Sequence, residues 1–319
     1  MISLKDIKNA RERIGDLAYV TPILQSAQLS NLCGNQMFLK SEHLQKTGSF
    51  KIRGASNKVI HAIENGAKYM TTASSGNHGQ AVAYVANKYG VPATIVVPEN
   101  VSVCKVNAIE AYNGKVEMCG TTSGERLPRA QAIAEQEHGI YIPPYDDPFI
   151  MSGQGTIGLE ILEQVENIDA IIVPIGGGGL ISGILTAIKE TNPKIKVIGV
   201  EPELANDTYL SLQNNKITSI PATNTIADGL RTNQPGDITF PVLMKYIDDI
   251  ILVSEDEIRQ AFSFTMERMK QLIEPSSATT IAAAMFNKLN LQGKNIVSVI
   301  SGGNVDLDKV PEFIVSTTK

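Results

Sequence analysis

Apolar residues gather in short, nearly unbroken runs that alternate with longer amphipathic stretches along most of the chain. Strands are predicted by the runs rich in β-branched residues, at 94–98, 170–175, 196–200, 249–253 and 295–300. Helical spacing is found between them, at 76–88, 102–112, 153–165, 179–190 and 254–272. Continuous apolar strands that alternate with helices are typical of a parallel sheet covered on both faces. The pattern therefore predicts an α/β fold.

Several expected helix ends carry capping residues. Ser254 stands three residues before Glu257, which is the capping-box spacing and predicts a helix start. Gly34, Gly90 and Gly114 stand where helices are expected to stop, because glycine enters the left-handed conformation without steric cost. No repeat, low-complexity segment or linker interrupts the sequence. We therefore expect two α/β lobes joined by short crossings.

Length and composition narrow the class of protein. A chain of 319 residues is long enough for about two domains. Apolar residues make up 43% and charged residues 19%, which is typical of a globular protein and not of a disordered one. The net charge is 28 − 33 = −5, only 5% of residues are aromatic, and Trp is absent. These values argue against a nucleic acid or an anionic membrane as the main partner.

Cysteine usage and the N-terminal segment favour a soluble, cytoplasmic protein. Cys33, Cys104 and Cys119 are too few and too scattered for a disulfide framework, and no Cys-x-x-Cys pair suggests a zinc ribbon. The segment MISLKDIKNARERIG lacks the apolar core of a signal peptide. Residues 170–188 carry no charge, but they include Pro174 and five glycines, so they predict a buried strand, turn and helix rather than a membrane helix.

Four consecutive glycines, Gly176, Gly177, Gly178 and Gly179, lie between a predicted strand and a predicted helix. Such a turn lets the backbone N–H groups approach an anion closely, and the helix N-terminus adds positive potential. A tight packing turn is the alternative. The spacing matches neither the dinucleotide fingerprint nor the P-loop. We therefore expect a smaller phosphate ester at this turn.

Two other turns carry candidate chemistry at helix starts. Ser74, Ser75, Asn77 and His78 follow a predicted strand, and their backbone N–H groups and hydroxyls suit a carboxylate. A simple helix cap would explain one serine, and a single histidine there is more often structural. Lys51 also stands at a predicted helix start, where the local field lowers the pKa of an amine and favours a nucleophilic, neutral form.

The ends of two other predicted strands carry candidate binding residues whose pattern is less specific for one ligand. Ser301 to Asn304 end the last apolar run, where a hydroxyl could face a ligand ring. Glu201 and Asp207 follow the strand at 196–200 and could form an oxygen-ligand site for a hard cation. On spacing alone, we favour a solvated acidic turn at that place.

Taken together, these segments resemble the fold-type II pyridoxal-phosphate enzymes, most closely the serine racemase and serine/threonine dehydratase group. The resemblance extends over essentially the whole chain. The matching segments, in order, are KTGSFKIRGA (46–55), SSGNHGQA (74–81), GQGTIGLE (153–160), GGGG (176–179), TIADG (225–229), the pair Glu274-Pro275 and SGGNVDL (301–307). Cysteine synthases and tryptophan synthase β-chains share the fold but differ in the phosphate and lysine segments.

The resemblance implies a specific α/β architecture. It consists of two open, twisted, mostly parallel α/β lobes of the tryptophan synthase β-like class, with the cofactor in the cleft between them. Residues 1–68 and 147–319 would form the large, cofactor-binding domain, and residues 69–146 the small domain. By the same resemblance we expect a homodimer.

The resemblance also implies roles for single residues. Lys51 would hold pyridoxal phosphate covalently and transfer the Cα proton, and Ser75 would serve as the acid on the opposite face. The remaining cofactor contacts would come from Phe50, Asn77, Gly176, Gly177, Gly178, Gly179, Glu274 and Ser301. The substrate would meet Ser74, Ser75, Asn77, His78, Arg126 and Thr232. Glu201, Asp207 and the carbonyl of Ala205 match a divalent-metal site, so the resemblance favours Mg²⁺ or a similar cation over the solvated turn.

The activity implied is interconversion of L- and D-serine, together with elimination of serine to pyruvate and ammonia. One alternative is an ammonia-lyase for L-serine, L-threonine or 3-hydroxyaspartate without significant racemisation. Ser75 and the metal motif favour racemisation, because many simple dehydratases of the family have alanine at the position of Ser75. A non-catalytic protein that binds the cofactor or an amino acid is a third possibility, and an intact Lys51 segment argues against it.

Overall fold

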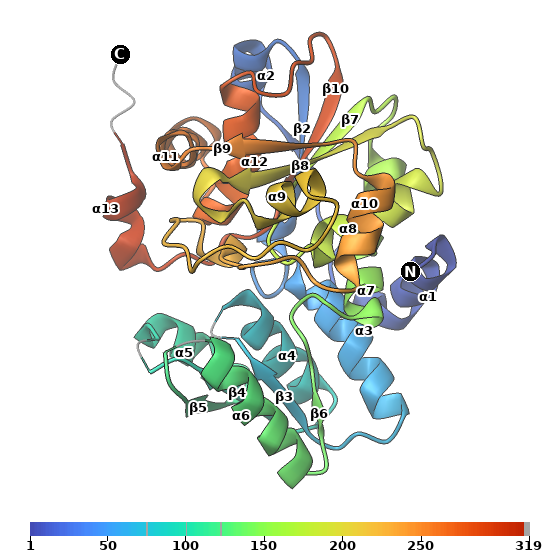
Figure 1. Cartoon of the computed structure of the whole chain (residues 1–319), viewed down its shortest axis with the longest axis vertical. Coiled ribbons are helices and arrows are strands. Elements are labelled where there is room, and N and C mark those ends of the chain that lie inside the picture. Colours follow the sequence, from blue (N-terminus) through green and yellow to red (C-terminus); the bar gives the residue numbers. More distant parts are fainter. Residues whose placement is uncertain (75, 100, 122, 316–319) are drawn as a thin grey trace.

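In the computed structural model, which describes residues 1–74, 76–99, 101–121 and 123–315, the chain builds two sheets (Figure 1). The larger sheet contains, in spatial order, β1 (Ile23–Gln25), β2 (Gln36–Ser41), β10 (Asn295–Ile300), β7 (Ala170–Pro174), β8 (Lys196–Pro202) and β9 (Asp249–Val253). The smaller sheet contains β5 (Lys115–Met118), β4 (Ala93–Val97), β3 (Met70–Ala73) and β6 (Ile140–Tyr141). Every strand pair is parallel except β1 with β2. The predicted α/β class with mostly parallel sheets is therefore confirmed.

The helices and turns between these strands have the following bounds. The α-helices are α1 (Leu4–Ile14), α2 (Ala27–Cys33), α3 (Lys51–Glu64), α4 (Asn77–Lys88), α5 (Val103–Glu110), α6 (Ser123–Gln136), α7 (Pro148–Gln164), α8 (Gly179–Lys189), α9 (Asp207–Gln213), α10 (Thr239–Tyr246), α11 (Glu255–Phe264), α12 (Pro275–Met285) and α13 (Val310–Phe313). Short 3₁₀ turns are η1 (Gly15–Leu17), η2 (Glu42–Leu44), η3 (Glu203–Ala205), η4 (Asp228–Leu230) and η6 (Leu307–Lys309), and η5 (Thr265–Met269) is a π-helical turn.

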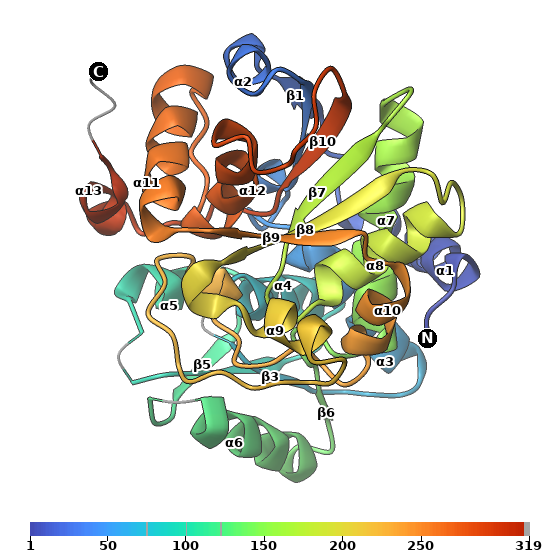
Figure 2. The same cartoon turned by 45° about the horizontal axis from the view of Figure 1, so that its top comes forward.

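The larger sheet is covered on both faces (Figure 2). Side chains alternate along β7, so Ile171 and Val173 pack with α7 and α8 while Ala170 and Ile172 pack with α11 and α12. Helix α10 lies on the α8 side, and α2 lies against α12. Two apolar cores thus flank one sheet, which explains why its central strand β7 is wholly apolar.

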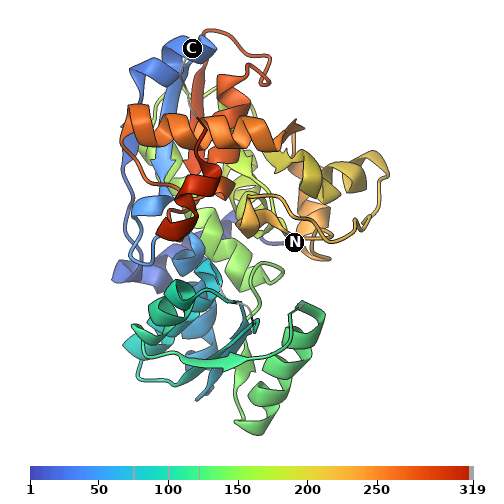
Figure 3. The same ribbon diagram turned by 90° about the vertical axis from the view of Figure 1, so that its left-hand side faces the viewer.

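The smaller sheet lies in the lower part of the molecule in Figure 3 and has its own core. Helices α4 and α5 cover one face, and α6 packs on β3 and β4 from the other. Helix α3 lies between the two sheets, because it packs on α4 through residues such as Val59 and on α7 of the larger unit. The predicted small domain, 69–146, spans the strands of this sheet, while the division into domains stays a prediction.

Helix ends differ from the sequence predictions in informative ways. The capping box at Ser254 and Glu257 is formed, and Gly34 ends α2 at φ +66° as predicted. Helix α7 begins five residues earlier than expected, because Asp147 accepts hydrogen bonds from the N–H groups of Phe149 and Ile150. Helix α5 stops at Glu110, before Gly114 is reached. The helix expected over 254–272 ends at Phe264 and continues only as a π-helical turn.

Two further features of the fold bear on the sequence predictions. Cys33, Cys104 and Cys119 are free thiols, as expected from their spacing. In the described ranges, no helix has both the length and the apolar character that crossing a membrane requires.

Candidate active site

Lys51 is the first residue of α3. Its ammonium nitrogen donates a hydrogen bond to the carbonyl oxygen of Pro144 at 2.7 Å and lies 5.2 Å from the ring centre of Phe50. Burial lowers the pKa of this amine to about 8, although the nearby Glu274 carboxylate acts in the opposite direction. The sequence predicted the lowered pKa from the helix N-terminus, whereas burial is the cause in the structure. A neutral, nucleophilic amine is therefore accessible near physiological pH.

The segment that carries Lys51 is hydrogen-bonded to the Ser301–Asn304 segment. The N–H of Phe50 donates to the carbonyl of Ser301 at 3.0 Å, and the N–H of Gly303 donates to the carbonyl of Gly48 at 2.9 Å. Asn304 adds a side-chain bond to the carbonyl of Thr47 at 2.8 Å. These bonds join residues about 250 positions apart, and they fix the entry of the chain into α3.

Asn77 and Glu274 extend this network from one sheet to the other. The Asn77 side chain accepts a hydrogen bond from Asn304 at 2.8 Å and donates one to the Glu274 carboxylate at 2.9 Å. Asn77 begins α4 of the smaller sheet, and Glu274 precedes α12 of the larger one. Burial, and then the charge of Asp228, raise the pKa of Glu274 to about 7. The three side chains thus connect both sheets beside Lys51.

Ser301 is buried at the end of β10. Its hydroxyl lies 3.0 Å from the hydroxyl of Ser277, which also donates to the carbonyl of Gly302 at 2.8 Å. A buried hydroxyl with a hydroxyl partner presents no negative charge to the cleft. It can therefore donate to, or accept from, a ligand atom without imposing protonation on it.

The glycine turn joins β7 to α8 as predicted. Gly178 has φ +90°, which favours glycine, and a Cβ on Gly177 would lie 2.4 Å from the ring of Tyr145. In the described part of the chain, the N–H groups of Gly176, Gly177 and Gly178 donate no hydrogen bond. These donors stand ahead of the N-terminus of α8, so the turn is suited to a phosphate group.

The turn after β3 is only partly described. Ser75 lies outside the described residues. The Ser74 hydroxyl accepts a long hydrogen bond from the N–H of Gly76, at 3.4 Å. His78 is buried, with Nε2 bonded to the carbonyl oxygen of Ile142 at 3.1 Å. Burial and the charge of Lys51 lower the pKa of His78 to about 3, so the ring is neutral at physiological pH.

Glu201 and Asp207 form a buried acidic pair. Glu201 accepts hydrogen bonds from the N–H groups of Thr208 and Tyr209, and the Thr232 hydroxyl lies 3.4 Å from the Asp207 carboxylate. Burial, and for Glu201 also the charge of Asp207, raise the pKa values to about 8 and about 7. The described residues include no group of three or more His, Cys, Asp or Glu side chains that could hold a metal ion. Any ion here would use these two carboxylates and carbonyl oxygens, such as that of the buried Ala205.

The two remaining predicted substrate contacts lie in different surroundings. Thr232 follows η4 and is close to Asp207, so it belongs to the neighbourhood of the acidic pair. Arg126 is half-buried in the first turn of α6, on the smaller sheet, where burial lowers the pKa of its guanidinium and the nearby Cys119 and Glu125 act in the opposite direction. Their contact with a substrate stays a prediction.

Sequence reasoning missed three contributors to the site. The carbonyl of Pro144 has no sequence signature, because every residue carries one. Ser277 and Asn304 lie in or near segments that the sequence marked, but only the fold shows that they support Ser301 and Asn77.

Comparisons with known proteins identify the family of the chain. Residues 14–302 match the family described as pyridoxal-phosphate dependent enzyme. Serine racemase of Dictyostelium discoideum is 44% identical over 318 residues, which cover 98% of each chain. L-threonine ammonia-lyase of Thermotoga maritima is 41% identical over 315 residues, which cover 98% of this chain and 78% of that protein. The solved structure of maize serine racemase superposes with a TM-score of 0.94 at 39% identity, covering 98% and 96% of the two chains.

Proposed function

The chain belongs to the family of pyridoxal-phosphate-dependent enzymes, and from this premise we propose that it interconverts L- and D-serine and eliminates water from serine to give pyruvate and ammonia. The single observation that carries the proposal is Lys51, whose half-buried amine has a pKa of about 8, donates to the carbonyl of Pro144 and lies near Glu274, the hydrogen-bond partner of Asn77.

The described residues fit pyridoxal phosphate. The unbonded N–H groups at Gly176 to Gly178 would hold its phosphate, and Lys51 would bind its aldehyde carbon. Asn77 and Ser301 would meet the polar atoms of the ring, with Phe50 packing beside it. When bound, the cofactor supplies an electron sink that acidifies the Cα–H bond of an amino acid.

The protein supplies the proton transfers. The Lys51 amine, once free, accepts the Cα proton on one face, and its pKa of about 8 suits reversible transfer near neutral pH. Racemisation needs a donor on the other face, and we assign that role to Ser75 from the sequence. Elimination needs only Lys51 and a donor to the leaving hydroxide. Because Ser301 carries no charge, it does not enforce a protonated ring nitrogen, and elimination can compete.

Incubation of the purified protein with L-serine tests the proposal. D-serine and pyruvate are followed in the same reaction, and both are expected to accumulate. Pyruvate without D-serine would support the lyase alternative. The absence of both products, also with L-threonine and 3-hydroxyaspartate, would overturn the proposed function.

A second candidate function is an ammonia-lyase for L-serine, L-threonine or 3-hydroxyaspartate without significant racemisation. The similarity to the Thermotoga maritima L-threonine ammonia-lyase favours it. Retention of Ser75 and of the acidic pair favours racemisation instead.

The proposal includes a divalent cation, Mg²⁺ or a similar ion, at Glu201 and Asp207 with the carbonyl oxygen of Ala205. What supports it is that two carboxylates are buried close together, and burial without a cation is costly. Oxygen ligands suit hard cations. A homodimer and a cytoplasmic location are also proposed; the first rests on the family resemblance and the second on the sequence alone.

A further inference from the structure

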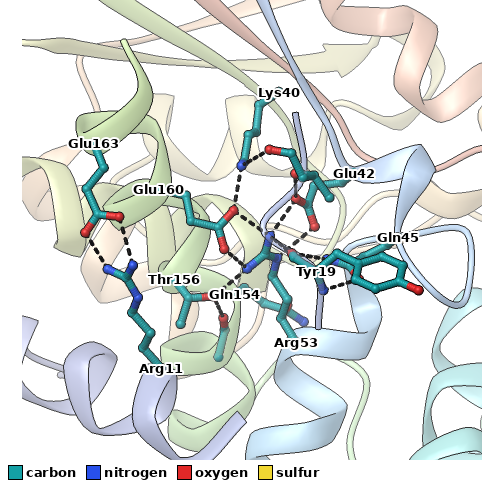
Figure 4. Close-up of polar contacts among 12 residues, drawn as sticks. Arg11, Tyr19, Lys40, Glu42, Gln45, Arg53, Gln154, Thr156, Glu160 and Glu163 are labelled. Carbon is teal, nitrogen blue, oxygen red and sulfur yellow. Dashed lines mark hydrogen bonds and ion pairs between the residues drawn. The ribbon is translucent and has the colours of Figure 1, made fainter. Parts of the chain in front are cut away.

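Four charged side chains meet in the interior behind the first turn of α3 (Figure 4). They are Lys40 of β2, Glu42 of η2, Arg53 of α3 and Glu160 of α7, and each is at most 4% exposed. Two positive and two negative charges balance. The cluster therefore joins four elements of the larger unit without a net buried charge.

Arg53 is the centre of this cluster. Its guanidinium binds the Glu42 carboxylate through two hydrogen bonds of 2.8 Å and the Glu160 carboxylate through bonds of 2.6 and 2.8 Å. Two neutral oxygens complete its contacts, the Thr156 hydroxyl and the Tyr19 carbonyl, both at 3.1 Å. All three guanidinium nitrogens donate hydrogen bonds, and the planar guanidinium of arginine allows this arrangement whereas the ammonium of lysine does not.

Lys40 and Thr21 form further hydrogen bonds with the two carboxylates. Lys40 donates to Glu160 at 2.5 Å and to the carbonyl of Thr21 at 2.8 Å, while the Thr21 hydroxyl donates to Glu42 at 2.5 Å. Burial alone would raise the pKa of Glu42, but Arg53 and then Lys40 hold it below its usual value. Glu42 is therefore ionised and able to hold Arg53 at physiological pH.

Arg53 and Lys51 point to opposite sides of the same helical turn. Two residues correspond to about 200° around an α-helix. Lys51 reaches the carbonyl oxygen of Pro144, whereas Arg53 reaches η2 and α7 on the other side of the helix. The adjacent Gly54 lies so close to α7 that a Cβ there would be 2.8 Å from the carbonyl oxygen of Ile150. The first turn of α3 is thus fixed on the side that carries Arg53, while the amine of Lys51 extends from the opposite side.

A buried cluster of this kind adds little to the free energy of unfolding, but it fixes the positions of the side chains that it joins. Buried ion pairs are often no more stabilising than apolar residues of the same volume, because desolvation offsets the attraction. Two bidentate contacts, however, restrict the position of the guanidinium in two directions. The segment before α3 is already fixed by Ser301 and Gly303. Lys51 lies directly between the segment held by Ser301 and Gly303 and the helical turn held by Arg53.

We propose that Arg53, held between Glu42 and Glu160, is a positioning residue that fixes the Lys51 amine for reaction with pyridoxal phosphate and for Cα proton transfer. This inference rests on the proposed role of Lys51. Arg53→Lys would retain the positive charge but remove the paired hydrogen bonds to Glu42 and Glu160. The first turn of α3 would then be held only by the backbone bonds of the segment before it. Misplacement of a reacting group by about 1 Å can cost about a hundredfold in rate.

The test is the reaction of Lys51 with the cofactor, measured on the full chain after removal and re-addition of pyridoxal phosphate. The rate of appearance of the visible adduct band is recorded against pH, and borohydride reduction followed by peptide mass analysis locates the adduct. Arg53→Lys is expected to slow the reaction about tenfold to a hundredfold. It should also move the pH midpoint upward, because a less ordered turn exposes the amine to water. Glu274 and His78, the groups that face Lys51, are unchanged in this variant.

Arg11→Lys is the matched control. Arg11 of α1 binds Glu163 of α7, one turn from Glu160, through its two terminal nitrogens, so its fork is held by a carboxylate of α7 and not by Glu42 or Glu160 (Figure 4). It is expected to keep the wild-type rate and midpoint. All variants are compared at a temperature at which thermal unfolding shows them folded. Wild-type kinetics in Arg53→Lys, or an equal loss in Arg11→Lys, would overturn the inference.

A milder variant keeps the inference testable if Arg53→Lys does not fold. Thr156→Val removes one neutral acceptor from Arg53 and leaves both carboxylates in place. A slowing of about threefold is expected, and an unchanged rate would contradict the positioning role. Failure of the wild-type protein to form any adduct at Lys51 would instead refute the proposed function, so the two failures are distinguishable.

Discussion

The Lys105 ammonium lies 3.0 Å from the Asp228 carboxylate, and this ion pair joins α5 of the smaller sheet to η4 of the larger unit. The segment of Asp228 reaches the site, because the carbonyl oxygen of Gly229 would lie 3.2 Å from a Cβ on Gly176. Both charged side chains are partly exposed, at 24% and 47%. The pair therefore links the smaller sheet to the segment beside the glycine turn. Because both side chains are partly exposed, little free energy is lost by removing their charges from water.

Removing this ion pair should loosen the contact between α5 and η4 beside the glycine turn. Lys105→Met and Asp228→Asn are each expected to lower kcat/KM for serine about twofold to fivefold, and the double variant should lose little more than either single one, since exposed pairs contribute up to about 1 kcal/mol. The control is Arg129→Met, because Arg129 pairs with Glu117 inside the smaller unit. Simple additivity of the two losses would show that the pair does not couple the sheets.

The pH dependence of cofactor binding should report the pKa of Lys51. Only the neutral amine attacks an aldehyde, and burial lowers the pKa from 10.5 to about 8. The rate of adduct formation should therefore rise up to about pH 8 and level off above it. A rate that continues to rise toward pH 10.5 would indicate a solvated lysine. No change near pH 6.5 is expected from His78, whose pKa is about 3.

Much of this site could be predicted from the sequence, and the missing parts share a physical reason. Apolar runs predicted β7, the strand that leads into the glycine turn, and the pattern along the sequence placed Lys51 and Asn77 at or next to helix starts. Local patterns carry no information on long-range pairing, so the contact between 46–51 and 301–304 appeared only in the fold. Arg53 and Glu160 were missed because charged residues are usually solvated, whereas here they neutralise each other in the interior.

Metal removal tests the buried acidic pair. Chelation should lower the thermal midpoint and the activity, because an ion at a hundredfold excess over its Kd stabilises the folded state by about 2.7 kcal/mol. Asp207→Ala should abolish the response to chelator and to added Mg²⁺. If wild-type protein in metal-free buffer shows neither a shift of the midpoint nor a loss of activity, Glu201 and Asp207 do not bind a functional cation.

Ser75 is expected to separate racemisation from elimination. It lies outside the described residues, so this prediction rests on the sequence. Lys51 can protonate only one face, and removal of a general acid typically costs about a hundredfold or more. Ser75→Ala should lower L-to-D conversion by that factor and also D-serine dehydration, while L-serine dehydration largely survives. Ser74→Ala in the same turn is the control, because loss of this predicted substrate contact should lower racemisation and elimination by the same factor. Wild-type racemisation in Ser75→Ala would assign the acid to another residue.

The most direct measurement of the central claim is the response of the protein to Lys51→Ala. Wild-type protein loaded with pyridoxal phosphate should show a visible adduct band and, after borohydride reduction, a cofactor-modified peptide that contains Lys51. Lys51→Ala should lose both signals and at least about a thousandfold in the formation of D-serine and pyruvate from L-serine. A Lys51→Ala protein that retains wild-type turnover, or a wild-type adduct on another lysine, would contradict the account.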